Sequence, residues 1–177
     1  SAMLSLRYDW NKLKAEDSFL SNGDDSGEIG LSSFNPSVGV NYMLSPGTHF
    51  YTQFSTSFET PTLNELSNNP SGQGGFNEEL SPQRARNIEL GLKGILNGKL
   101  QYDLAYFFIR TRDEIVSFEL EDFPGRDFFR NAGETVRNGL ESQIKYAFAK
   151  NWRLNLAYTY SDFYYDSYIN GGDDFSG

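Results

Sequence analysis

Few residues in this chain have the types and spacing that catalysis requires. His49 is the only histidine, and cysteine is absent. Histidine and cysteine therefore supply at most one zinc ligand, and Ser-His-Asp or Cys-His sites are disfavoured. The run Ser142-Gln143-Ile144-Lys145 matches Ser-x-x-Lys, but it alternates like a strand and lacks the helix that this motif needs. We expect no catalytic residue, no cofactor and no enzymatic activity, which disfavours a β-rich hydrolase.

Two acidic clusters offer oxygen ligands of the kind that Ca²⁺ prefers. They are Asp24-Asp25-Ser26-Gly27-Glu28 and Asp173-Asp174. Neither has the spacing of an EF-hand loop, so solvated loop charge explains them better. We expect no metal site.

Arginines and aromatic residues gather in the second half of the chain. Five arginines fall near four acidic residues: Arg110, Arg112, Arg126, Arg130 and Arg137, with Asp113, Glu114, Asp122 and Asp127. A hairpin of paired charges is the simpler interpretation, and a basic lip that steers an anionic ligand is the alternative. Phe163, Tyr164, Tyr165 and Tyr168 form an aromatic segment that either anchors a loop or stacks on an aromatic ligand. The candidate ligand-binding residues are Arg126, Arg130, Tyr164, Tyr165 and Tyr168, all placed in loops.

Composition excludes several classes of protein. The 177 residues carry a formal net charge of -9, which argues against a nucleic-acid partner, because phosphate binding needs a basic face. No run of about eighteen apolar residues is present, so no transmembrane helix is predicted. Ser1 and Ala2 resemble residues left from an expression vector, and Gly177 falls inside a polar segment. We expect residues 1–177 to be one partial domain cut from a longer protein.

The segments that must position these residues alternate apolar and polar side chains. The plainest example is Asn87–Arg112, where Ile88, Leu90 and Leu92 alternate with polar residues or glycine up to Asn97-Gly98. This dipeptide predicts a two-residue hairpin turn, with arms of about eleven residues, roughly twice the usual strand length. Similar alternation predicts strands around 4–10, 34–44, 50–58, 140–148 and 152–160. Thr62 to Leu66 carries a capping-box pattern that predicts a short helical turn.

The connections alternate between long polar loops and tight turns. The long ones are 14–33, 59–84 and 162–177, and the tight ones fall at Ser45-Pro46-Gly47, Asn97-Gly98 and Lys150-Asn151. The sequence therefore predicts an all-β, antiparallel up-and-down meander of about seven long strands, with every long loop at one end. A strand of about eleven residues tilted near 40° rises roughly 28 Å, enough for the ~25 Å apolar band of an outer-membrane barrel. In a membrane barrel, the apolar side chains point to lipid and aromatic residues near strand ends form the interfacial girdles.

Alternation alone also suits a soluble β-sandwich that binds carbohydrate or protein. A sandwich has shorter strands and loops of mixed length at both ends, so we favour the membrane barrel. A passive porin shares the barrel and stays open on this pattern.

Several short motifs, in order, resemble TonB-dependent outer-membrane receptors. Ser57-Phe58-Glu59-Thr60-Pro61-Thr62-Leu63-Asn64-Glu65-Leu66 resembles the family's "SF-x-x-P-x-x-x-E-L" segment. Leu80-Ser81-Pro82-Gln83 with Asn87-Ile88-Glu89-Leu90-Gly91 resembles "L-x-P-E … x-x-E-L-G", with Gln83 where Glu is commoner. Later similarities are Ala105-Tyr106-Phe107 with Glu114-Ile115-Val116, Arg130-Asn131-Ala132-Gly133 with Asn138-Gly139-Leu140-Glu141, and Leu156-Ala157-Tyr158-Thr159-Tyr160.

The resemblance implies a 22-stranded barrel filled by an N-terminal plug, in the outer membrane of a Gram-negative bacterium. It implies TonB-dependent uptake of a scarce nutrient such as a ferric siderophore, and the basic lip would then attract an anionic ferric chelate. The implied partners are the lipid bilayer with lipopolysaccharide, the nutrient, and the TonB complex through a region outside this chain. The plug and terminal strands lie outside residues 1–177. With two open sheet edges, the isolated fragment is expected to self-associate or to need detergent.

Overall fold

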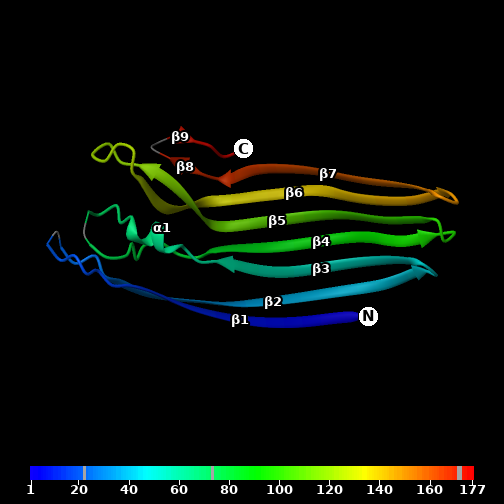
Figure 1. Cartoon of the computed structure of the whole chain (residues 1–177), viewed down its shortest axis with the longest axis horizontal. Coiled ribbons are helices and arrows are strands. Elements are labelled where there is room, and N and C mark those ends of the chain that lie inside the picture. The colour runs from blue at the N-terminus through cyan, green and yellow to red at the C-terminus, as the bar shows by residue number, and fades with distance from the viewer. Residues whose placement is uncertain (22, 73, 171–172) are drawn as a thin grey trace.

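The computed structural model describes residues 1–21, 23–72, 74–170 and 173–177, and within them the main feature is a seven-stranded antiparallel sheet. Each strand pairs with its sequence neighbours, so the sheet is an up-and-down meander (Figure 1). This confirms the predicted fold class. The strands are β1 (Ala2–Ala15), β2 (Gly27–Ser45), β3 (Thr48–Glu59), β4 (Gln83–Leu96), β5 (Leu100–Glu119), β6 (Asp127–Ala149) and β7 (Trp152–Ser167).

Two smaller elements lie at the ends of these strands. Helix α1 (Leu63–Ser67) lies in the connection between β3 and β4, and β8 (Ile169–Asn170) pairs with β9 (Asp173–Asp174) as a separate hairpin. The described residues contain no helix whose length and apolarity would let it cross a bilayer.

The tight turns all lie at one end of the sheet and the long connections at the other (Figure 1). At the central tight turn, Asn97 has φ 51° and Gly98 has φ 65°, which is the left-handed pair that a type I′ turn requires. The Lys99 N–H donates to the Leu96 carbonyl at 3.1 Å and closes this turn. The predicted alternation of connections is confirmed.

The strands are longer than predicted. They run from 12 residues in β3 to 23 in β6, and β1, β2 and β7 continue into segments that the sequence had assigned to loops. The polar segment 14–33 contributes paired residues up to Ala15↔Gly27, and β7 continues through Tyr164 and Tyr165. A polar segment in water can continue a strand, because the backbone N–H and C=O groups still pair with the neighbouring strand whatever the side chains are.

One face of the sheet is apolar and exposed. Residues directly opposite each other share a face, so the row Tyr42, Phe50, Leu92 and Leu104 runs across four strands on that side. Leu154, Leu156 and Tyr158 on β7 are 51%, 52% and 60% exposed. No layer of the described chain covers this apolar face. A two-sheet sandwich is therefore excluded for these residues, and an outward lipid-facing surface accounts for them.

The opposite face, called here the polar face, carries hydrogen-bonding and charged side chains. A representative row is His49, Lys93, Asp103 and Gln143. On β4, even-numbered positions on the apolar face are mostly exposed and odd-numbered ones on the polar face are mostly half-buried. This pattern is typical of a sheet that curves toward its polar face, because side chains crowd on the concave side.

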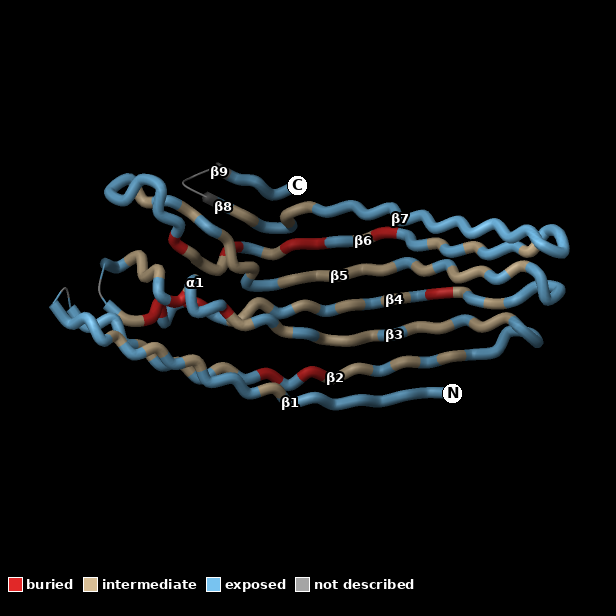
Figure 2. The backbone as a smooth tube through the Cα atoms, viewed as in Figure 1, coloured by how far each residue is buried: buried red, intermediate tan, exposed pale blue. Residues whose placement is uncertain are grey.

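Most of the apolar buried residues lie toward the long-loop end, and Figure 2 also shows buried segments on β2, β4 and β6. Leu66, Phe76 and Leu80 form the buried cluster, and five partly buried residues pack against it: Leu13, Ala15, Ile29, Ile115 and Phe129. The connection between β3 and β4 thus contacts both the β1–β2 and the β5–β6 hairpins. We call this cluster the rim core.

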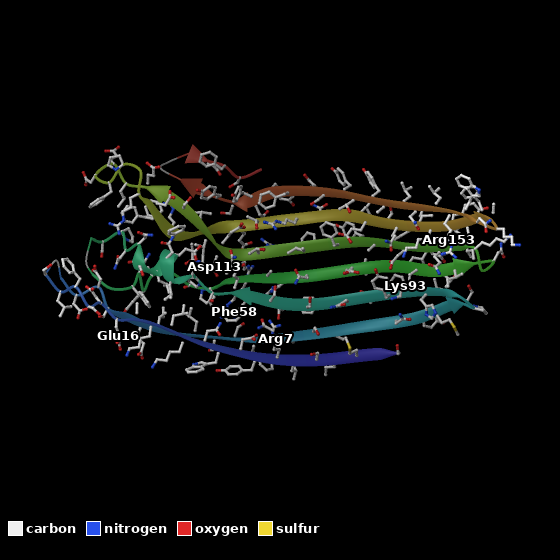
Figure 3. All side chains as sticks on the ribbon, viewed as in Figure 1. Arg7, Glu16, Phe58, Lys93, Asp113 and Arg153 are labelled. Atoms are coloured by element: carbon white, nitrogen blue, oxygen red, sulfur yellow. The ribbon has the colours of Figure 1, made fainter. Side chains whose placement is uncertain are left out.

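Aromatic rings lie over glycines on the polar face. A Cβ built on Gly91 would approach the Tyr51 Cζ to 2.1 Å, so the ring lies directly over the glycine backbone. The Tyr51 hydroxyl donates to Asp103 Oδ1 at 3.4 Å. Lys93, whose place on β4 is labelled in Figure 3, has its Nζ 4.9 Å from the Tyr51 ring centroid. Only glycine at position 91 lets Tyr51 span from β3 to β5.

We predict that Gly91→Val in the full-length protein lowers the free energy of unfolding by about 1–3 kcal/mol, because the added side chain overlaps the Tyr51 ring. Chemical unfolding of the refolded protein in lipid vesicles measures this change. Gly30→Val is the matched control, since a Cβ there meets nothing within 4 Å. Equal losses in the two variants would show that Tyr51 packing over Gly91 is not responsible.

Candidate functional site at the loop end of the sheet

The connection between β3 and β4 begins with a rigid helical turn. Thr62 Oγ1 accepts from the Glu65 N–H at 3.3 Å, and Glu65 Oε2 accepts from the Thr62 N–H at 2.7 Å. This reciprocal pair is the predicted capping box, and it caps α1. Leu66 within α1 and Pro61 just before it are fully buried. The Pro, Glu and Leu of the Ser57–Leu66 motif therefore hold this connection in place.

Asn131 on β6 fastens the far end of the same connection. Its Nδ2 donates to the Ser81 carbonyl at 2.8 Å, and its Oδ1 accepts from the Ser81 N–H at 2.7 Å. The same Nδ2 donates to the Asp113 carbonyl at 2.6 Å. The Asn131 side-chain amide thus makes the two hydrogen bonds that a paired strand residue would make with Ser81. It links the Leu80–Gln83 motif to the Arg130–Gly133 motif, 50 residues further along the chain.

Gly133 allows the β5–β6 hairpin to twist above the sheet. It has φ 46°, and a Cβ there would lie 1.4 Å from the Ser167 carbonyl oxygen. Asp113, the facing residue on β5, has φ 56°, and ladder pairing is interrupted between Arg112↔Glu134 and Glu114↔Ala132. The Asn131–Gly133 motif is therefore explained by backbone geometry.

The predicted basic candidates lie on the β5–β6 hairpin and stack on aromatic rings. The Arg126 guanidinium lies 5.0 Å from the Phe128 ring centroid and donates from Nε to Asn68 Oδ1 at 3.2 Å. Arg130 lies on strand β6 and not in a loop, which corrects the sequence prediction, and its guanidinium lies 5.0 Å from the Phe118 ring centroid. The Phe118 and Phe128 rings are 6.1 Å apart, so the structure brings the two arginines into one basic–aromatic stack.

Of the tyrosine candidates, Tyr164 and Tyr165 lie on strand β7 and not in a loop, which corrects the sequence prediction. Tyr165 pairs with Thr135, and Tyr164 pairs with Val136, so their side chains lie on opposite faces. The Tyr165 ring lies 5.6 Å from Phe163 and 4.9 Å from Tyr168, which in turn lies 5.5 Å from Phe175. We call these four rings the aromatic ladder. Tyr164 is outside it.

Two other arginines of the predicted basic lip form ion pairs. Arg110 donates from Nε to Glu134 Oε2 at 2.7 Å and from Nη2 to Asp166 Oδ2 at 2.6 Å. Arg112 Nε lies 2.8 Å from Glu134 Oε1. Arg137 lies 4.7 Å from the Phe163 ring. Arg110 and Arg112 thus pair with acids, but with Glu134 and Asp166 and not with the four acidic residues that the sequence placed near them.

Sequence reasoning missed Arg84 and Arg86 on β4, which lie directly opposite Arg112 and Arg110. The signal was present, since these positions continue the alternation of Ile88 and Leu90. It was overlooked because 59–84 was assigned to a loop and the strand was expected to begin at Asn87, whereas β4 begins at Gln83.

The acidic segment after β1 is organised by its own hydrogen bonds. The Ser26 N–H donates to Asp24 Oδ1 at 2.9 Å, and hydrogen bonds from the Ser26 side chain and backbone lower the pKa of Asp24. Lys12 pairs with Glu28 at 2.6 Å and lowers the pKa of Glu28. Among the described residues, no group of three or more His, Cys, Asp or Glu side chains is arranged to hold a metal ion.

A family model described as "TonB dependent receptor-like, beta-barrel" matches residues 1–177, the whole chain. The chain belongs to the TonB-dependent receptor β-barrel family. This family is located in the outer membrane of Gram-negative bacteria, and it is one of transport receptors rather than enzymes. Since outer-membrane barrels have short periplasmic turns and longer extracellular loops, the rim core lies on the extracellular side.

Solved structures with the same fold are receptors and transporters. The chain is similar to the copper transporter OprC, with a TM-score of 0.70 and 20% identity over 93% of this chain and 26% of that one. It is also similar to the alcaligin receptor FauA of Bordetella pertussis, with a TM-score of 0.62 and 20% identity over 99% of this chain and 30% of that one. A third similar structure is BauA, the ferric preacinetobactin receptor of Acinetobacter baumannii, with a TM-score of 0.59 and 19% identity over 93% of this chain and 23% of that one. The chain spans between 23% and 30% of these proteins, and the similarity establishes the fold.

We predict that Asn131→Ala in the full-length receptor loosens the connection between β3 and β4. Without the side chain, the Ser81 N–H and carbonyl lose their partner, which costs about 1–3 kcal/mol and speeds local amide exchange roughly ten- to a hundredfold. Hydrogen–deuterium exchange of the peptide that spans Leu80–Gln83 reports this change. Asn11→Ala on β1 is the control. Unchanged exchange in the Asn131 variant would show that the amide does not hold this connection.

Proposed function

We propose that the full-length receptor containing this chain takes up a scarce nutrient, such as a ferric siderophore, by TonB-dependent active transport. The observation that carries the proposal is the family match over residues 1–177. Two of the similar structures are siderophore receptors and one is a copper transporter, which supports a scarce metal in chelated or free form as cargo.

We also propose that residues 1–177 are one part of a larger barrel. The edge strands β1 and β7 each have one neighbour in this sheet, which leaves backbone groups for further strands to pair with. The remaining strands, a plug and the segment that contacts TonB would come from other parts of the receptor. The polar face would then line the lumen, and the apolar face would contact the bilayer.

The aromatic ladder is the strongest candidate for ligand capture. Phe163 and Tyr165 lie on the polar-face side of β7, opposite Arg137 and Thr135, so rings and a guanidinium share one surface. Flat rings beside a positive charge suit an anionic chelate with aromatic groups. Tyr165 and Tyr168 would stack on the ligand. Arg126 and Arg130, held on their phenylalanines, would add positive potential at the rim.

Transport is tested by deleting the receptor and measuring uptake of labelled ferric siderophores, haem and copper by the cells. Uptake of at least one of these is expected to depend on the receptor and to stop when TonB is removed. Uptake that depends on the receptor but persists without TonB would support a passive porin instead.

We predict that Tyr165→Ala in the full-length receptor weakens binding of the transported chelate roughly three- to tenfold, the loss expected from about one stacking contact. Fluorescence titration of the purified receptor measures the dissociation constant. Tyr164→Ala is the matched control, because that ring belongs to the same strand but to the opposite face. If both variants bind like the unaltered receptor, the ladder does not contact the ligand.

We further predict that the isolated chain of 177 residues self-associates or requires detergent, because its apolar face and two sheet edges are uncovered. Analytical ultracentrifugation without detergent measures this. A soluble monomer with cooperative unfolding would contradict the lipid-facing assignment.

A further inference from the structure

A hollow lies on the polar face at the tight-turn end of the sheet, over β5, β6 and β7. It has a volume of about 620 Å³, and six polar side chains line it: Lys99, Lys145 and Arg153 with Gln101, Gln143 and Asn155. Arg153 is labelled at this end of the sheet in Figure 3. Among the residues that the structure describes, no carboxylate lines the hollow. We call this site the basic hollow, because the charged groups that line it are cations.

The small side chain of Ala147 on β6 lies between two of the cations of the basic hollow. The Ala147 N–H donates to the Lys99 carbonyl at 2.9 Å on one side, and Ala147 pairs with Arg153 on the other. Since neighbouring strands lie about 4.8 Å apart, the Lys99 and Arg153 backbones are roughly 10 Å apart across this row. Lys145 has the same parity as Ala147 and lies one row further from the turns, so the three cations border the same space.

The polar groups of the basic hollow lack partners within the described part of the chain. None of the six polar side chains makes a hydrogen bond or an ion pair with another described residue. Lys12 at the opposite end of the sheet, in contrast, pairs with Glu28 at 2.6 Å. Three like charges on neighbouring strands repel one another, and a bound anion would remove that repulsion.

The donors of the basic hollow suit a ligand that carries several carboxylates. A guanidinium such as that of Arg153 can hold one carboxylate through two parallel hydrogen bonds, and the lysine ammonium and side-chain amide groups can donate to further oxygens. The spacing of roughly 10 Å between the Lys99 and Arg153 backbones is wider than one carboxylate, so acidic groups on two sides of a ligand would be held together. These donors are side chains on strands and not backbone N–H groups at a helix N-terminus, which favours carboxylates over phosphate.

We propose that the basic hollow is a second binding site for the transported chelate, and that it holds two or more carboxylates of that chelate at the periplasmic end of the lumen. Short turns mark the periplasmic end of an outer-membrane barrel, and the aromatic ladder lies at the other end of the sheet. A chelate captured at the extracellular rim would therefore meet the basic hollow on its way out of the barrel. This inference rests on the proposed transport function, and it adds a substrate class, an anionic polycarboxylate chelate, and a site on its exit route.

The first test measures binding without transport and uses citrate, a small tricarboxylate, as the probe. Isothermal titration of the purified full-length receptor in detergent gives the dissociation constants of citrate and of acetate, which has one carboxylate. We expect citrate to bind at least about tenfold more tightly than acetate, the effect of roughly one further charge-assisted contact. Lys145→Gln with Arg153→Gln is expected to weaken citrate binding at least about tenfold. Lys12→Gln with Lys14→Gln removes the same charge at the opposite end of the sheet, and this control is expected to bind citrate like the unaltered receptor.

The second test measures uptake of the transported chelate by cells that carry Lys145→Gln with Arg153→Gln. We expect unchanged affinity for the chelate at the cell surface and an uptake rate roughly three- to tenfold lower, because only the exit site is altered.

Three results would overturn the proposal. The first is equal citrate binding by the unaltered receptor and the Lys145/Arg153 variant, which is also the result expected if acidic side chains from another part of the receptor fill the basic hollow. The second is an equal loss of citrate binding in the Lys12/Lys14 control. The third is weaker citrate binding with unchanged uptake. Absence of any receptor-dependent uptake would instead contradict the proposed function, and the citrate titration separates that result from a failure of the site.

Discussion

The need to satisfy every backbone hydrogen-bonding group inside a bilayer constrains the whole of this chain. Strands meet that need only by pairing with each other, so the ladder from β1 to β7 continues across the apolar band. Because successive side chains of a paired strand point to opposite faces, the apolar residues face lipid and the polar residues face the lumen. Leu92 and Lys93 are neighbours in the sequence, yet Leu92 belongs to a row on the apolar face and Lys93 to a row on the polar face.

At the extracellular end, hydrophobic packing holds the connection between β3 and β4 against the strands. There water surrounds the chain, and burial of Leu66, Phe76 and Leu80 against neighbouring hairpins becomes favourable again. Asn131 adds directional bonds to Ser81 that fix how the connection between β3 and β4 sits. The family motifs that lie in this region keep the rim in one arrangement. The aromatic ladder lies beside this packed rim, at the end of β7.

Much of the fold could be predicted because its signals are local. Asn97-Gly98 requires positive φ, Thr62 and Glu65 are three residues apart, and alternation needs no distant information. The ends of strands were predicted poorly. Lys14 and Glu28 are polar, yet they pair in the ladder, because in water the partner strand and not side-chain hydrophobicity decides where pairing stops. For the same reason Tyr164 and Tyr165 were placed in a loop, although both extend β7.

The sequence by itself determined the class of fold, the direction of the apolar face and the family, because alternation and ordered motifs are properties of neighbouring residues. Only the tertiary structure decided which distant groups meet. It placed Arg84 against Arg112, Asn131 against Ser81, and Tyr165 against Thr135. Such contacts depend on register between strands and on the twist at Asp113 and Gly133, and both are set by the packing of whole hairpins.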